Sequence, residues 1–420
     1  MTDLRITDLA RPEYNDFQRA ALAYGESIET CFDPQGILDE ASAALGLADF
    51  GDPEFRQRLD LICAEWDADS GLTGLGRYSL RNRLLGYARN RLLIEDILRR
   101  HPEIHAIEIN RPIIVVGLPR SGTTHLVNLL AADSRLRAMP LWESYEPVPT
   151  PGEGLLADGT DPRYQRCAEA WAMMQQTVPH LAAMHPMDPD HINEEIELML
   201  PNFASYNFEW FTHSPRYRDH YLAMDQLPHY VYMKTVIKIM QFLQPQTAPT
   251  RWVLKSPMHL ENLPELQAVF PDASFVVTHR DPVSVIQSTV TMLAYGQRMN
   301  RKSILIDELI DYWTDRIEHL LRRCLETRHL LPDERSIDVP FHAFMADEQG
   351  TVEKIYNKAG LKLNAVARRE MAQFIEDHPR GKHGKVVYDL QGDFGADPEV
   401  LRQRFQFYFD ASPAIAETGQ

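Results

Sequence analysis

The stretch that decides the fold reads Ile113-Ile-Val-Val-Gly-Leu-Pro-Arg-Ser-Gly-Thr-Thr-His-Leu-Val-Asn-Leu-Leu130. Four β-branched residues at its start predict a strand that is buried on both faces, as in a parallel sheet. A loop with one proline and two glycines follows, and apolar residues then recur at helical spacing. A strand, a glycine loop and a helix in this order direct backbone N–H groups and the positive end of a helix toward one anion. The stretch therefore predicts a phosphate-binding loop.

This loop differs from the Walker A motif G-x-x-x-x-G-K-[ST] at the position that matters most for NTP hydrolysis. Gly117 and Gly122 keep the spacing of the two glycines. Thr123, however, stands at the lysine position, and Arg120 lies inside the loop. Thr124 fills the position of the hydroxyl that holds magnesium. Because the lysine that NTPases place on the transferred phosphate is missing, we do not expect ATP or GTP hydrolysis.

The overall charge of the chain restricts its partners. With 43 Lys and Arg against 60 Asp and Glu, the formal net charge is −17. This charge disfavours binding of nucleic acid or of an anionic membrane through bulk electrostatics. An anionic ligand would therefore need a local basic pocket.

The cysteines and the apolar segments indicate a compartment. The four cysteines lie far apart and form no C-x-x-C pair, which predicts free thiols in a reducing environment rather than a disulfide framework or a zinc site. The first residues lack an apolar core of the kind found in signal peptides, and no segment has the length of a membrane span. We therefore expect a cytoplasmic protein with no integral membrane segment.

The apolar patterns predict an α/β fold with a parallel sheet like that of P-loop NTPases, flanked by helices. Residues 1–103 show helical periodicity and are expected to form a helical N-terminal region, in which Gly71, Gly74 and Gly76 predict a flexible turn. Residues 104–420 are expected to form the α/β domain. Within it, residues from about 150 to 249 are rich in Met, His and aromatic residues and predict a helical insert, the usual place for an acceptor pocket or a lid.

Two charged residues are expected near the phosphate loop, because ligands of such sheets bind at the carboxyl ends of the strands. Lys255 ends a predicted strand that begins near Arg251, and its alternative is a solvated lysine in a turn. Glu143 follows the short apolar stretch that starts at Met139, and its alternative is a surface glutamate before a proline-rich loop.

A second phosphate-binding pattern follows the predicted strand at residues 273–277. Arg280 comes three residues after the end of this strand, and Asp281 and Pro282 are favourable residues for starting a helix. Ser288 lies about two turns into that helix. Arginine offers a planar fork to a phosphate and serine adds a hydroxyl donor, so this arrangement also predicts an anion site.

Together these two motifs resemble those of sulfotransferases that use 3′-phosphoadenylyl sulfate (PAPS). Pro-Arg-Ser-Gly-Thr-Thr after a strand is similar to their 5′-phosphosulfate loop, and the strand–Arg–Pro–helix–Ser pattern is similar to their 3′-phosphate motif. The resemblance covers roughly residues 104–394 and looks most like the bacterial branch, which shares the loop with tyrosylprotein sulfotransferases. The basic glycine loop near residue 380 is similar to a late loop of the family. The resemblance implies these PAPS-binding residues: Arg120, Ser121, Gly122, Thr123, Thr124, His125, Arg280, Ser288, Arg380, Gly381 and Lys382.

The resemblance also implies a reaction, the transfer of a sulfuryl group from PAPS to a hydroxyl, which leaves 3′-phosphoadenosine 5′-phosphate (PAP). Arg120 and Lys255 would stabilise the charge that builds on the leaving phosphate, so no metal is needed. The acceptor hydroxyl must lose its proton to a base. Glu143 is the first choice for this base, because tyrosylprotein sulfotransferases carry a glutamate at a similar distance after the loop; His259 and His185 are its competitors.

The acceptor and two other functions stay open at this point. The Met- and aromatic-rich insert favours a small apolar acceptor with a hydroxyl group. A P-loop kinase acting on a small molecule would instead require ATP and magnesium, and the missing Walker lysine disfavours it. A catalytically silent nucleotide-binding protein is the other alternative. The sequence does not indicate an oligomeric state.

Overall fold

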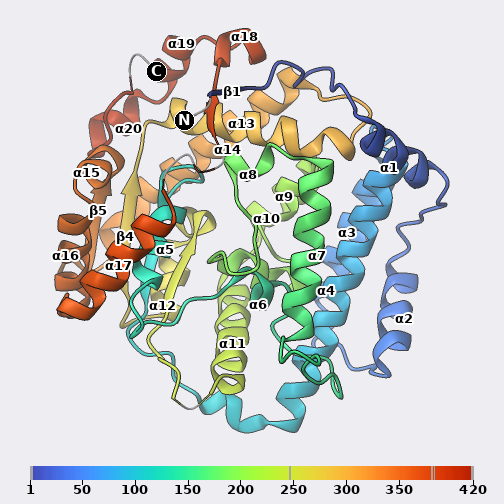
Figure 1. Ribbon diagram of the computed structural model, residues 1–420, viewed down its shortest axis with the longest axis horizontal. Helices are drawn as coiled ribbons and strands as arrows, with labels where there is room; N and C mark the ends of the chain where they lie inside the picture. The colour runs from blue at the N-terminus through green and yellow to red at the C-terminus, as the bar shows by residue number, and fades with distance from the viewer. Residues whose placement is uncertain (1–2, 246, 380–381, 383, 418–420) are drawn as a thin grey trace.

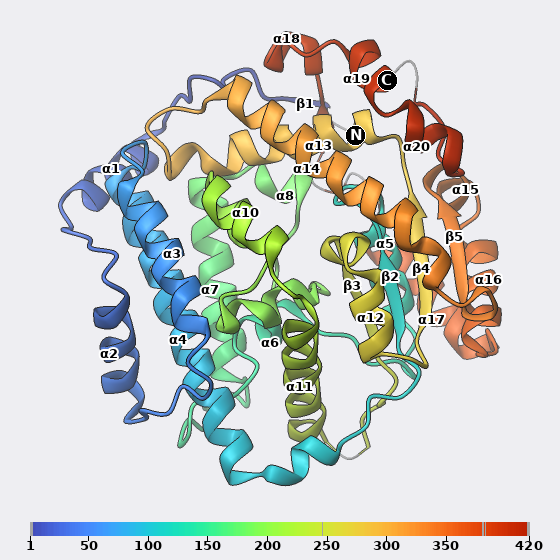
Figure 2. The same ribbon diagram turned by 180° about the vertical axis from the view of Figure 1, so that it is seen from behind.

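The computed structural model describes residues 3–245, 247–379, 382 and 384–417 of the chain. Its α/β part, on the left of Figure 1, is built on a sheet of parallel strands in the order β3-β2-β4-β5, which Figure 2 labels. These strands are β2 (Ile113–Val116), β3 (Val253–Ser256), β4 (Ser274–His279) and β5 (Ser336–Pro340). Every residue of β2, β3 and β4 is buried, which explains why their sequences are mostly apolar runs. The predicted parallel sheet flanked by helices is confirmed.

Alternate residues of the central strand face two different hydrophobic clusters. Ile113 and Val115 pack on the face covered by α5 (Thr123–Ala131), α16 (Glu348–Ala359) and α17 (Ala365–Asp377). Ile114 and Val116 belong to the larger cluster on the other face. That face is covered by α12 (Leu263–Val269), α13 (Pro282–Gly296) and α14 (Ile306–Thr327), and Figure 2 shows α12 and α14 in front of the strands.

The strand register brings three segments to one edge of the sheet. Val115 lies opposite Lys255 on β3 and opposite Val276 on β4. The carboxyl ends of the three strands are therefore aligned. As a result, the loop after β2, the side chain of Lys255 and the residues after β4 share this edge.

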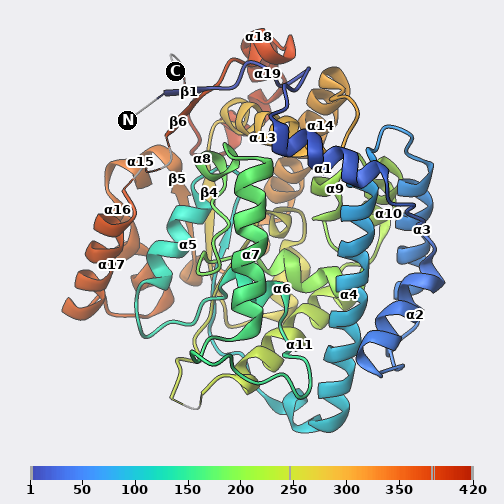
Figure 3. The ribbon, with the colours of Figure 1, turned by 45° about the vertical axis from the view of Figure 1, so that its right-hand side comes forward.

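The N-terminal region is helical, as predicted, and packs beside the insert (Figure 3). It contains α1 (Asp16–Glu26), α2 (Pro34–Leu45), α3 (Phe55–Ala68), α4 (Gly74–Arg100) and the 3-10 helix η1 (Pro102–Ala106). Its apolar residues share one cluster with a face of the sheet. The pattern did not predict β1 (Asp3–Arg5), which pairs in parallel with β6 (Lys385–Val387) near the other end of the chain.

The expected flexible turn around three glycines is wrong for two of them. Gly74 and Gly76 lie in the first turn of α4, where the Thr73 hydroxyl accepts the N–H of Gly76 at 2.9 Å. A Cβ atom on Gly76 would lie 2.2 Å from the carbonyl oxygen of Asn300. Here glycine allows close approach of a neighbouring backbone rather than a turn.

The insert is also helical, as predicted, and it runs between β2 and β3 in the sequence. Its elements, with the short helix that precedes it, are α6 (Leu141–Tyr145), α7 (Pro162–Thr177), α8 (Leu181–Met184), η2 (Glu195–Asn202), α9 (Phe208–Phe211), α10 (Pro215–Ala223) and α11 (Leu227–Leu243). The 3-10 helix η2 contacts both α4 and β3, so the insert reaches the edge of the sheet that carries the loop.

The remaining elements complete the C-terminal part. They are η3 (Pro257–Glu261), η4 (Gln297–Met299), η5 (Arg328–Leu330), η6 (Asp333–Arg335), α15 (Phe341–Ala346), α18 (Leu390–Phe394), α19 (Pro398–Arg404) and α20 (Gln406–Ala411). Across the residues that the structure describes, no helix combines the length and apolarity needed to cross a membrane.

Candidate active site

The phosphate loop is held tightly against the sheet. A Cβ atom on Gly117 would lie 1.8 Å from the Thr278 hydroxyl, so only glycine allows the chain to leave β2 so close to β4. The hydroxyl of Ser121 donates to the carbonyl of Leu118 at 2.6 Å and lies 3.0 Å from that of Thr278. The Ser121 side chain thus braces the loop from inside.

The turn into α5 uses backbone conformations that few residues adopt. Gly122 caps the helix at a φ of 84° and Arg120 has a φ of 63°, both in the left-handed region. For arginine this conformation carries a strain of the kind found at functional sites. The first amides of α5, at Thr123 and Thr124, have no acceptor within the helix and lie at its positive end. This geometry suits an anion.

Lys255 connects this loop to the insert. Its ammonium group donates to the Thr124 hydroxyl at 3.3 Å and forms an ion pair with Glu194. The backbone N–H of Lys255 donates to both carboxylate oxygens of Glu195, at 2.7 and 2.9 Å. The two neighbouring glutamates therefore fix opposite sides of one lysine. The Lys255 side chain is 2% exposed, whereas that of Glu194 is 18% exposed.

Arg120 reaches from the loop to the helices that follow β4. Its Nε donates to the Ser288 hydroxyl at 2.9 Å, and its Nη1 donates to the carbonyl of Met184 at the end of α8. The Ser288 hydroxyl in turn donates to the Tyr388 hydroxyl at 3.0 Å. The arginine of the first predicted motif and the serine of the second are thus in direct contact.

Arg280 joins the same edge from β4. Its Nη1 donates to the carbonyl of Arg120 at 2.6 Å, and its guanidinium lies 4.0 Å from the centre of the Phe341 ring. That ring also lies 3.0 Å from the position that a Cβ on Gly122 would take. The Nε and Nη2 of Arg280 donate to the carboxylate of Glu417. The two predicted phosphate motifs therefore meet on one edge of the sheet.

Of the other predicted PAPS-binding residues, the structure describes His125 and Lys382. His125, in the first turn of α5, has its Nε2 3.2 Å from a carboxylate oxygen of Glu348 and packs against the ring of Phe344. Lys382 is exposed after α17. Arg380 and Gly381 lie outside the described residues.

Glu143, the first choice for the base, has a different set of neighbours. Its carboxylate pairs with Arg137, whose carbonyl accepts the N–H of Val253 at the start of β3. It also lines a cavity of about 400 Å³ together with Trp142 and Met240. Among the contacts of the described residues, none joins Glu143 to the loop or to the lysine of β3.

The two histidines proposed as competing bases differ in exposure. His259 is 0% exposed; its Nδ1 lies 2.9 Å from the Tyr230 hydroxyl and its Nε2 3.4 Å from Glu195. His185 directly follows α8 and is half-buried. Burial and the nearby Arg120 lower the pKa of His185, while Glu194 opposes this change. The structure therefore brings His185, and not His259, into an accessible place beside the loop.

Sequence reasoning did not select Glu194 as a site residue. The run Asn193-Glu194-Glu195 could equally have been a solvated surface, because neighbouring acidic residues are common on helices. The structure gives them separate partners, since one carboxylate takes the ammonium and the other the backbone N–H of the same lysine. Only the contact between η2 and β3 in the folded chain shows that the two glutamates bind different groups of Lys255.

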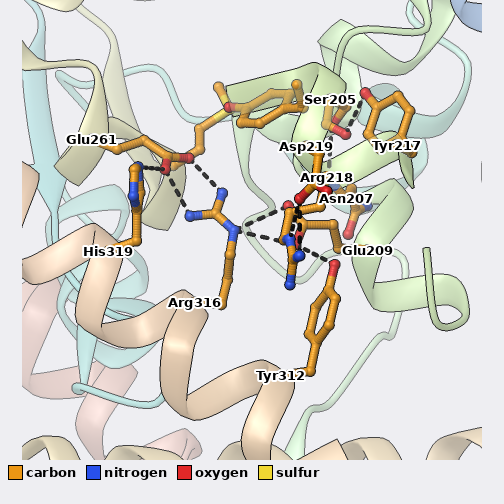
Figure 4. Close-up of polar contacts among 12 residues, drawn as sticks. Ser205, Asn207, Glu209, Tyr217, Arg218, Asp219, Glu261, Tyr312, Arg316 and His319 are labelled. Atoms are coloured by element: carbon orange, nitrogen blue, oxygen red, sulfur yellow. Dashed lines mark hydrogen bonds and ion pairs between the residues drawn. The ribbon is translucent and has the colours of Figure 1, made fainter. Parts of the chain in front are cut away.

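A second charged cluster lies deep in the molecule and was not predicted (Figure 4). Arg316 of α14 stands between Glu209 and Glu261 and donates to both carboxylates at 2.7–3.1 Å. The Tyr312 hydroxyl donates to Glu209 at 2.7 Å, and His319 lies 3.4 Å from Glu261. Because Glu261 ends η3 directly after β3, this cluster fixes the strand that carries the site lysine against α14 and α9.

The fold and the site together define an α/β protein with a modified P-loop. A family model described as "Sulfotransferase family" matches residues 112–365. The chain therefore belongs to the sulfotransferase family and is a sulfotransferase. The predicted family membership and enzyme class are confirmed.

Relatives place the chain in the bacterial branch, as predicted. Omega-hydroxy-beta-dihydromenaquinone-9 sulfotransferase Stf3 of Mycobacterium bovis and of Mycobacterium tuberculosis is 24% identical over 275 residues, which cover 64% of this chain and 67% of each relative. Sulfotransferase STF1 from Mycobacterium tuberculosis, whose crystal structure is known, has 28% sequence identity to this chain. The two structures superpose with a TM-score of 0.75, over 88% of this chain and 97% of the STF1 chain. The crystal structure of STF9 from Mycobacterium avium has the same fold at 24% identity, with a TM-score of 0.81 and 93% and 99% coverage.

Proposed function

We propose that this sulfotransferase transfers the sulfuryl group of PAPS to the hydroxyl of a small apolar acceptor. The products are a sulfate ester and PAP. The observation that carries this proposal is the contact between the two phosphate motifs, in which Arg280 donates to the carbonyl of Arg120 at 2.6 Å. A single adenylate with phosphates at both its 5′ and 3′ positions needs two anion sites at such close range.

The residues at this edge fit the cosubstrate chemically. The amides at the start of α5 and the ammonium of Lys255 suit a 5′-phosphosulfate, and the bare Cα of Gly122 leaves backbone free to approach it. The fork of Arg280 suits the 3′-phosphate, with Ser288 nearby through Arg120. From the sequence, Arg380, Gly381 and Lys382 stay candidates for this site, to which the two basic residues would add positive charge.

In the reaction, the acceptor oxygen forms a bond to sulfur while the bond from sulfur to the bridging phosphate oxygen breaks. The electron pair of the broken bond goes to that oxygen, where Lys255 and Arg120 stabilise the negative charge. The acceptor proton goes to a carboxylate or an imidazole within hydrogen-bond reach. Two fixed cations at the leaving oxygen supply the charge that this step requires.

For the base we propose Glu194 in place of Glu143. Lys255 contacts both the Thr124 hydroxyl and Glu194, so this carboxylate lies next to the group that receives the leaving phosphate. It is also partly exposed and can meet an acceptor. Glu143 pairs instead with Arg137, away from Lys255 in the contacts of the described residues, and His259 has no exposed surface. His185 is the second candidate.

The proposed acceptor class rests on a relative and on the insert. Stf3 is named for an omega-hydroxylated dihydromenaquinone, a hydroxyl on an apolar molecule. The insert of this chain, which reaches the same edge of the sheet through η2, is rich in Met and aromatic residues. An apolar alcohol or phenol is therefore the acceptor class that we propose.

We also propose a reducing compartment such as the cytoplasm. Cys63, Cys167 and Cys324 are buried free thiols and Cys31 is an exposed one. Burial raises the pKa of the Cys63 thiol to about 12, which leaves it protonated and unreactive.

The test is turnover of radiolabelled PAPS with a panel of apolar alcohols and phenols, in Glu194→Gln and Glu143→Gln variants. Loss of a general base lowers kcat about 10²- to 10⁴-fold, so we expect this loss in Glu194→Gln with PAP binding no weaker than in the parent enzyme, because Lys255 stays in place. Glu143→Gln serves as the matched control, and its kcat should stay near that of the parent enzyme. The reverse outcome would return the role to Glu143, and full activity in both variants would transfer it to His185. A thermal shift with PAP, and none with ATP and magnesium, would exclude the kinase alternative.

A further inference from the structure

The C-terminal segment folds back onto the phosphate-binding edge. After α20 the chain turns, and Ala414 is buried in the main hydrophobic cluster. The backbone N–H of Glu417 donates to a carboxylate oxygen of Asp281 at 2.8 Å, and its carbonyl accepts from Arg402 at 3.3 Å. Three separate contacts thus fix this segment beside α13 and α19.

The side chain of Glu417 is aimed at the arginine of the second phosphate motif. Its two carboxylate oxygens accept from Nε and Nη2 of Arg280 at 2.7 and 2.9 Å, a bidentate pair. The side chains are 14% and 18% exposed, so the pair lies at the opening of the site rather than in the core. The third nitrogen of the guanidinium holds the carbonyl of Arg120.

We infer that the C-terminal segment is an intramolecular competitor of PAPS, in which the Glu417 carboxylate takes the N–H groups of Arg280 that the 3′-phosphate would bind. This inference rests on the proposed role of Arg280 in cosubstrate binding. A carboxylate and a phosphate present oxygens of similar geometry to the same arginine fork. Because one pair of N–H groups cannot serve both, PAPS enters as the carboxylate leaves.

The anchoring of the segment decides how it acts. Asp281 uses one carboxylate oxygen to cap α13 at Val283, and offers the other to the backbone of Glu417. The segment can therefore stay attached through its backbone and through Ala414 while its side chain swings away. Tethering keeps the carboxylate at a high effective concentration beside Arg280. The apparent affinity for the nucleotide then falls with the fraction of molecules in which the carboxylate has left.

The test is calorimetric titration of the full chain with PAP. We compare the parent chain with Glu417→Ala and with a chain that ends at Ala416, which keeps the buried Ala414. Asp410→Ala is the matched control, because it removes an equal charge from α20, where Asp410 is exposed and contacts Gln406. Hydrogen exchange of the C-terminal peptide, measured with and without PAP, follows the segment itself.

We expect Glu417→Ala and the shortened chain to bind PAP about three- to tenfold more tightly than the parent, with Asp410→Ala unchanged. We also expect PAP to speed exchange at the C-terminal peptide of the parent chain. Equal or weaker PAP binding by both altered chains would overturn the competition. Absence of PAP binding in every chain would instead overturn the proposed role of Arg280, so the two failures are distinct.

Discussion

Two clusters of arginine and carboxylate groups serve different purposes in this molecule. In the buried cluster, Arg316 is enclosed by Glu209 and Glu261, and the exposed fraction of each side chain is 3% or less (Figure 4). At the phosphate-binding edge, Arg280 pairs with Glu417 and both side chains keep access to solvent. The first cluster is closed to ligands, and the second is open to them.

The comparison shows that the cost of breaking an ion pair depends on how deeply the pair is buried. Every nitrogen of Arg316 donates to a carboxylate on a rigid element, and replacing one partner would leave a buried charge uncompensated. The pair of Arg280 and Glu417 can separate at lower cost than the pairs of Arg316, because water or a phosphate can reach the freed groups. We therefore expect changes in the first cluster to affect folding, and changes in the second to affect binding.

The largest effect is expected for Arg316→Met. This substitution leaves Glu209 and Glu261 buried without a cation, and breaking a buried pair in this way costs about 3–5 kcal/mol. The free energy of unfolding, measured in urea, should fall by that amount. Molecules that remain folded should bind PAP with the Kd of the parent chain.

The matched control for this prediction lies on the same helix. Arg322 pairs with Glu318 on the surface, and Arg322→Ala should change the free energy of unfolding by less than about 0.5 kcal/mol. If the two substitutions cost the same, enclosure would not explain the difference between the clusters.

The next effect is expected for Arg280→Ala, in binding rather than in folding. Each hydrogen bond to a charged group contributes about 1.5–3 kcal/mol, and about 1.4 kcal/mol corresponds to tenfold in affinity. The Kd for PAP should therefore rise at least about tenfold, as measured by calorimetry, with the urea midpoint nearly unchanged. Arg368→Ala, which removes the same charge from an exposed pair with Glu353, is the control. An unchanged Kd in Arg280→Ala would refute the 3′-phosphate assignment.

The arginines at the phosphate-binding edge could be predicted from the sequence. Arg120 lies in the loop after one apolar strand and Arg280 directly after another, and parallel strands place such positions on one edge. Local spacing was sufficient there, because strand, loop and helix are contiguous in the sequence. The strands β2, β3 and β4 and the helical insert were predictable for the same reason.

The partners of these cations could not be predicted, because they come from distant segments. Glu417 lies 137 residues from Arg280, and Glu194 lies 61 residues from Lys255. No periodicity links such positions, and Glu143 was preferred only for its distance from the loop. The same reason explains the missed pairing of β1 with β6. Arg316 and its carboxylates looked like ordinary polar positions of an amphipathic helix and its neighbours, since enclosure is a tertiary property.

The smallest effect is expected for Glu197, a partly buried carboxylate that belongs to neither cluster. Burial raises its pKa from 4.5 to about 7; Arg83 and a hydrogen bond from Asn207 oppose this, and Glu194 adds to it. The folded chain therefore holds this proton more tightly than the unfolded chain. Stability should fall as the pH rises from about 4.5 to about 7, by about 1–2 kcal/mol, because the partly exposed side chain is screened. Urea unfolding across this range should show a flatter pH dependence in Glu197→Gln.

Two further variants, one at an exposed carboxylate and one at Glu194, test what causes this pH dependence of the free energy of unfolding. Glu326→Gln, on the surface of α14, should keep the pH dependence of the parent chain. Glu194→Gln removes the negative charge that helps to raise the pKa of Glu197 in the folded chain, so the fall in stability should still begin near pH 4.5 and should end at lower pH. A slope that does not move in Glu194→Gln would mean that the two carboxylates are not coupled. A shifted slope would instead show that the ionisation of Glu194, the proposed base, is felt by a second carboxylate of the same 3-10 helix, and that the open cluster extends from the phosphate loop into the insert.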